Sequence, residues 1–115
     1  LLCLNAPFAG CIPSYPTNSP TFIDSQLASL QSKSGYDRSF DGGSSPTSIN
    51  SNISSTSSVT SYAYWATPTS PGQTGVRGFA GDSSGILCFS TNGATAAVTG
   101  DIGLNTNDAS CNVLQ

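Results

Sequence analysis

Residues 59–66, VTSYAYWA, are mostly apolar and rich in aromatic and β-preferring side chains. A strand with this pattern has two distinct faces. One face would carry Ser61, Ala63 and Trp65, and the other Tyr62, Tyr64 and Ala66. Aromatic and β-branched residues suit a pleated, half-buried surface. The segment is therefore predicted to be a strand, and the pattern leaves open which of its faces is buried.

Three further strands are predicted around this segment. Residues 78–82 and 86–90 flank Ser83, Ser84 and Gly85, a sequence typical of a tight hairpin turn. The stretch 68–75 contains two Pro and two Gly and is expected to be a loop. Upstream, the alternation in residues 35–40, GYDRSF, indicates a first strand. The predicted fold is α+β, mostly β: an antiparallel meander of about four strands with one short helix and long loops.

The short helix is predicted over residues 21–34. Ile23, Leu27 and Leu30 are spaced to lie on one helical face. Asp24 or Thr21 could cap its start, and Gly35 suits its exit.

The length of the chain indicates a single domain, residues 1–115. An apolar and Pro-rich N-terminal arm, 1–20, precedes the helix. The antiparallel sheet, 35–90, contains a Ser/Thr-rich loop at 41–58, and a C-terminal tail occupies 91–115. The large apolar residues of the arm either pack on the domain's own core or dock on another chain. They are Leu1, Leu2, Leu4 and Phe8.

Charged residues are scarce. Three Lys and Arg residues stand against six Asp, and the chain contains neither His nor Glu. This balance offers no electrostatic footprint for nucleic acid. Without His, neither a Ser-His-Asp nor a Cys-His arrangement can form, so we expect a protein that is not an enzyme. No motif for a metal or another cofactor is found, and none is expected.

Four cysteines, Cys3, Cys11, Cys88 and Cys111, indicate an oxidising compartment and therefore export. No CxxC pair occurs, which argues against a zinc site. Three disulfide pairings are possible. The most economical one joins Cys3 to Cys11 and Cys88 to Cys111, because each bond then closes a local loop. No run of about 18 apolar residues suggests a membrane-spanning helix.

Two segments resemble the globular head of type IV pilins and pilin-like proteins. The first is ATPTSPGQTGVRGFAGDSSGIL, residues 66–87, which follows the pattern A-x-P-x-[ST]-P-G-x-T-G-x-R-x-F-x-x-D-x-S-G-x-[IL]. The second is FIDSQLAS, residues 22–29, followed by KSGY at 33–36. The two occur in the order expected for such heads, and together they comprise 34 of the 115 residues.

The chain departs from the pilin pattern in one respect. Pilins carry a long apolar N-terminal helix with a Glu near its start, and this chain has no Glu and no such helix. It resembles the head subunit of a split pilin, in which a short helical pilin chain supplies the stalk. The resemblance implies a structural subunit of an extracellular, cell-surface filament, bound to that helical chain and to neighbouring copies. Contact with a membrane would occur only through the partner.

A head without its stalk would leave one sheet face open to the partner's helix, because a sheet needs a covering layer. The predicted interface comprises Leu1, Leu2, Leu4, Phe8, Tyr62, Tyr64 and Trp65. A second hypothesis is a secreted binding module or adhesin that uses its aromatic side chains as a ligand platform.

Overall fold

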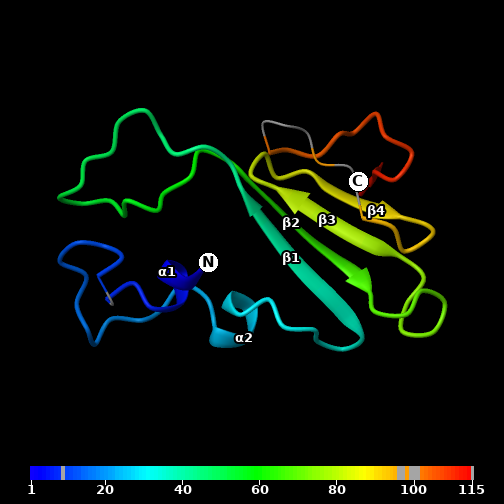
Figure 1. Cartoon of the computed structure of the whole chain (residues 1–115), viewed down its shortest axis with the longest axis horizontal. Helices are drawn as coiled ribbons and strands as arrows, with labels where there is room; N and C mark the ends of the chain where they lie inside the picture. The colour runs from blue at the N-terminus through cyan, green and yellow to red at the C-terminus, as the bar shows by residue number, and fades with distance from the viewer. Residues whose placement is uncertain (9, 96–97, 99–101, 115) are drawn as a thin grey trace.

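The computed structural model describes residues 1–8, 10–95, 98 and 102–114. Its strands pair consecutively into one antiparallel sheet of order β1-β2-β3-β4-β5 (Figure 1). They are β1 (Tyr36–Gly42), β2 (Tyr62–Pro68), β3 (Gly78–Asp82), β4 (Leu87–Ser90) and β5 (Asn112–Val113). The predicted mostly-β meander is confirmed, with one strand more than expected. The Ser/Thr-rich loop spans 43–61, because β1 continues to Gly42.

The additional strand, β5, lies in the predicted tail. It pairs with β4 through Cys88 opposite Val113 and Phe89 opposite Asn112. The disulfide between Cys88 and Cys111 joins the same two segments. Two residues are too few to show a strand period, so the covalent bond explains the position of β5 better than any pattern does. Residues 96–97, 99–101 and 115 of this tail lie outside the described part of the chain.

The predicted extent of the helix, 21–34, is wrong. The helix α2 is a single turn, Ser25–Ala28. Asp24 caps it as expected, and its carboxylate accepts the Leu27 N–H at 2.7 Å. Leu30 has a φ of +55°, which lies in the left-handed region and ends a right-handed helix. The apolar spacing that suggested a longer helix therefore reflects loop residues that happen to fall at helical intervals.

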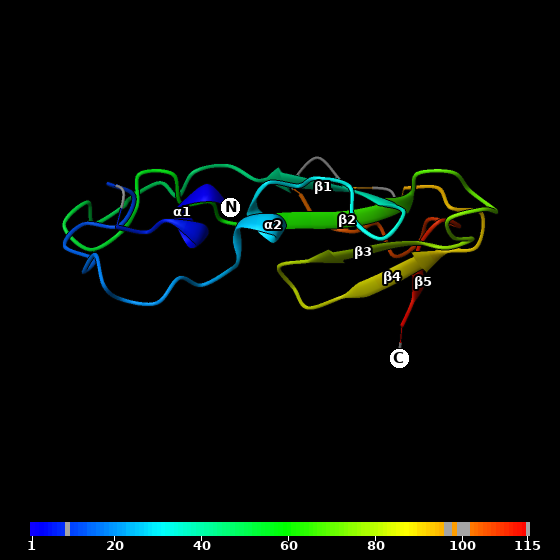
Figure 2. The same ribbon diagram turned by 90° about the horizontal axis from the view of Figure 1, so that it is seen from below.

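A second helical turn, α1 (Leu2–Asn5), lies in the arm, where no helix was predicted. It ends ahead of Pro7, because the residue before a proline avoids the helical region. The Leu4 carbonyl accepts the N–H groups of Phe22 and Ile23, which ties the arm to the segment before α2. In both views the arm and the 43–61 loop project beyond the same end of the sheet (Figures 1 and 2). No helix among the described residues is long and apolar enough to cross a membrane.

The tail packs on one face of the sheet and forms the core there. The buried cluster consists of Ala80, Cys88, Leu104 and Cys111, with Trp65 and Ile86 packed against it. Both predicted disulfide pairs of the economical arrangement, Cys3–Cys11 and Cys88–Cys111, are present. The second pair lies inside the core, where Cys88 is fully buried. It therefore joins the tail to the sheet within the buried cluster.

Asp82 provides a polar anchor beside this core. Its side chain is buried and accepts the Leu104 N–H at 2.8 Å and the Ser84 N–H at 2.9 Å. The Ser84 hydroxyl donates to the same carboxylate. Burial by itself raises the pKa of this carboxyl, but the hydrogen bonds from Leu104 and Ser84 outweigh it and leave the pKa below its ordinary value. The ionised form of Asp82 therefore holds the tail on the β3–β4 hairpin.

A lowered pKa in the folded state means that the Asp82 carboxylate stabilises the fold above the unfolded-state pKa of about 4. That contribution is lost as the pH falls through the lower pKa of the folded state. We expect Asp82→Asn to lower the free energy of unfolding at pH 7 by about 1.5–3 kcal/mol, since it weakens hydrogen bonds to a charged acceptor. Urea denaturation at pH 7 and at pH 3 measures both effects. The exposed Asp41→Asn is the control, and an unchanged pH dependence in Asp82→Asn would contradict the assignment.

Candidate functional site

The sheet face opposite the tail carries an open apolar groove. Cross-strand partners share a face, and one row of partners runs across four strands: Phe40, Tyr64, Gly81 and Leu87. Gly81 lies between two large residues, and a Cβ placed on it would approach Leu87 Cδ2 to 2.8 Å. The missing side chain therefore lets Leu87 lie close against the β3 backbone on this face.

Aromatic rings extend this floor along the strands. Phe40 stacks on Tyr62 with ring centroids 6.0 Å apart, and Phe79 lies 6.2 Å from Tyr36. Tyr62 and Phe79 are 43% and 40% exposed, and Leu87 is 55% exposed. Exposed large apolar residues that adjoin one another mark contact surfaces more often than isolated ones do.

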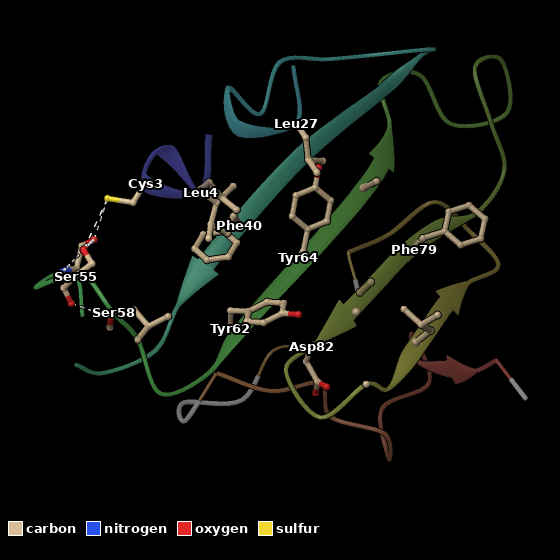
Figure 3. Close-up of a pocket in the computed structure, with 18 of the residues that line it drawn as sticks. Cys3, Leu4, Leu27, Phe40, Ser55, Ser58, Tyr62, Tyr64, Phe79 and Asp82 are labelled. Atoms are coloured by element: carbon tan, nitrogen blue, oxygen red, sulfur yellow. Dashed lines mark hydrogen bonds between the residues drawn. The ribbon is translucent and has the colours of Figure 1, made fainter. Parts of the chain in front are cut away.

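The walls of the groove come from the arm, α2 and the long loop. Leu1 and Leu4 line it from the arm, Leu27 from α2, and residues 53–55 and 57–59 from the loop. The Cys3–Cys11 disulfide closes the arm, and the Cys3 sulfur lies 3.3 Å from the Ser57 hydroxyl. Figure 3 shows Leu4 beside Phe40 and Leu27 at the hydroxyl end of the Tyr64 ring. Residues far apart in the sequence thus enclose one side of the sheet face.

The groove has a volume of about 1090 Å³ and a mostly apolar lining. None of the three cations lines it: Arg38 donates to the carbonyls of Gln31 and Gln26, and Lys33 donates to the Gln26 side chain. Arg77 lies over the Phe89 ring, 4.7 Å from its centroid. The carboxylate of Asp82, at one end, is already engaged by Leu104 and Ser84. The groove is therefore suited to an apolar ligand and offers no charge with which to bind an ionic one.

Four of the predicted interface residues come together here: Leu1, Leu4, Tyr62 and Tyr64. Leu2 and Phe8 are 72% and 42% exposed but do not line the groove.

The prediction that Trp65 lies on the same interface as Tyr62 and Tyr64 is wrong. Trp65 packs against the buried cluster on the tail side of the sheet, because consecutive strand residues alternate between faces. The sequence pattern predicts the strand but leaves open which of its two faces is buried. The tail decides this by covering the face that carries Trp65.

Leu27 and Leu87 are among the groove residues that were not predicted as interface. Leu27 was assigned only to a helical face, and Leu87 only to a strand. The signal for Leu87 was available in the hairpin: the pairing around Ser83 and Ser84 places it on the same face as Tyr64, with Gly81 between them. Comparison with known proteins adds no further candidate, since no family model, no curated protein and no solved structure matches this chain.

Proposed function

We propose that this chain is the head subunit of a split type IV pilin or pilin-like protein, and that the groove is the seat for the helix of a second chain. The observation that carries the proposal is the open apolar groove across β1, β2, β3 and β4, where a pilin head would meet its stalk. The two sequence segments that resemble pilin heads support it independently. The role is structural, with no reaction and no cofactor.

A helix suits the groove better than an extended chain does. The strands that form the floor use their backbone groups in pairing with one another. An occupant lying on that face must satisfy its own backbone N–H and C=O groups, and an α-helix does so internally. The distance from β1 to β4 is three strand spacings, about 14 Å. A helix with side chains is about 10–12 Å wide, so a single helix fits within this width.

A second copy of the sheet fits less well. Two sheets pack face to face about 10 Å apart, and both faces must be clear of obstructions. Here Leu1 at the chain start, Leu4 of α1 and Leu27 of α2 lie along one side of the face. These walls favour a narrow rod over a flat layer.

The alternative function is a secreted binding module or adhesin, for which the stacked pair of Phe40 and Tyr62 is the favouring observation. Small-molecule sites are usually about 300–1,000 Å³ and combine apolar walls with several converging polar groups. This groove is slightly larger and has an apolar floor, which favours the helix.

The proposed location is the cell surface, outside the membrane. Two disulfides within one small domain fit an oxidising compartment. In the filament the head would also touch neighbouring copies, and it would reach the membrane only through the helical chain.

Co-expression with a short helical pilin chain tests the proposal. We expect a one-to-one complex that survives size-exclusion chromatography in mild detergent. Chemical shift changes on binding should map to the groove face and spare the tail face. A head that stays monomeric beside that chain, or that instead binds oligosaccharides on Phe40 and Tyr62, would overturn the proposal.

A further inference from the structure

Tyr64 carries a buried hydroxyl on the floor of the groove. Among the described residues, its oxygen is the one buried side-chain polar atom without a hydrogen-bond partner. Figure 3 shows it pointing toward the apolar side chain of Leu27. The large majority of buried side-chain polar atoms in proteins are hydrogen-bonded, so this group calls for an explanation.

Packing alone does not explain the hydroxyl. Phenylalanine at position 64 would fill the same space between Phe40 and Gly81 without placing an oxygen against Leu27. The neighbouring Tyr62 differs, because it is 43% exposed and its ring meets solvent. The Tyr64 hydroxyl therefore serves no packing role that Phe would not fill, and a groove ligand that displaces Leu27 could pair with it.

We propose that the Tyr64 hydroxyl forms a hydrogen bond with a single uncharged side chain, an amide or a hydroxyl, on the apolar face of the partner helix. The inference rests on the proposed function and specifies the chemistry of the partner. An amide can donate to and accept from a phenol. A charged group on the partner is disfavoured. No Lys or Arg lines the groove to compensate a buried carboxylate. Asp82, which could compensate a buried cation, already accepts the Leu104 N–H.

Access to the hydroxyl requires only a local change. Leu27 is half-buried on the one-turn helix α2. Rotamer changes of interface side chains are common on binding, so an arriving helix can displace Leu27 and reach the oxygen. The pairing would also fix the register, because a helix that slides by one turn leaves both its polar group and Tyr64 unpaired.

Two synthetic helices of about 20 residues, about 30 Å long, test this inference. Both have the same Leu- and Ala-rich apolar face, and they differ at one central position, which is Gln in one peptide and Leu in the other. Their dissociation constants are measured by fluorescence anisotropy against the wild-type head, Tyr64→Phe and the control Tyr62→Phe. The ratio of Gln-peptide to Leu-peptide affinity is expected to be about tenfold higher for the wild-type head than for Tyr64→Phe. Comparing the two heads cancels the greater apolar burial of Leu.

Tyr64→Phe buries the Gln amide unpaired and should therefore lose this advantage of the Gln peptide, whereas Tyr62→Phe should keep the wild-type ratio. Urea denaturation of each variant checks that the head is folded. Equal affinity ratios for the wild-type head and a folded Tyr64→Phe would overturn the inference while leaving the groove as a helix seat. Failure of both peptides to bind would instead count against the proposed function itself.

Discussion

Replacing Cys88 and Cys111 together with alanine is expected to lower the free energy of unfolding by about 3 kcal/mol. The bond closes a loop with a sequence separation of 23 and joins the tail to the sheet inside the core. For a loop of this length, the loss of cross-linking entropy in the unfolded chain predicts a change of that size. Urea denaturation followed by the fluorescence of Trp65, which packs on the same cluster, measures it.

The matched control is the double replacement of Cys3 and Cys11, whose sequence separation is 8. Its shorter loop and half-buried position predict a smaller loss of stability, about 2.5 kcal/mol or less. Because the arm lines the groove, this variant should affect helix binding more than folding. Equal destabilisation by the two double variants would refute the assignment of the tail bond to the core.

Leu87→Asp is expected to weaken binding of the helical chain by at least a hundredfold. Leu87 is 55% exposed on the groove face, so the free head should keep its stability within about 0.5 kcal/mol. In the complex the variant loses about 1.5–3 kcal/mol of apolar burial and also buries an unpaired carboxylate. Binding and urea denaturation should be measured on the same preparation.

Val76→Asp is the control for this variant. Val76 is 61% exposed in the loop between β2 and β3 and does not line the groove. It adds the same charge to the same domain, so it corrects for any general effect of net charge. Comparable loss of binding in Val76→Asp and Leu87→Asp would show that the groove is not the contact surface.

The strand pattern predicted most of the sheet. The strand predicted at 59–66 corresponds to β2, which begins and ends later, at Tyr62–Pro68, and the predicted hairpin at 78–90 corresponds to β3 and β4. The loop predicted at 68–75 from its Pro and Gly residues runs over 69–77 in the structure. In the structure Gly75 of this loop serves packing, since a Cβ on it would collide with Tyr36, whereas Gly72 provides a φ of +85° in open space. Just before β1, a Cβ on Gly35 would collide with Thr74 of the loop. The residues that resemble a pilin motif therefore include several whose part in the structure is to let this loop close on β1.

The failures have a common physical origin. The extent of α2 is set by the backbone at Leu30, and β5 is set by a disulfide. The buried face of β2 is set by the tail. The first is a local backbone conformation, and the other two depend on contacts between segments distant in sequence; periodicity contains neither. For the same reason Leu27 and Leu87 could be assigned to elements but not to one groove.

The open groove face has a consequence for the solubility of the chain when it is not bound to a partner. Only 8% of the residues are charged, and the net charge is −3, so electrostatic repulsion between heads is weak. Tyr62, Phe79 and Leu87 then give free heads an adhesive surface, and apolar patches of this kind promote aggregation. We expect light scattering of the isolated head to rise with concentration and to fall when the helical chain is added. Balanced production of the two chains would thus be a condition for keeping the head in solution.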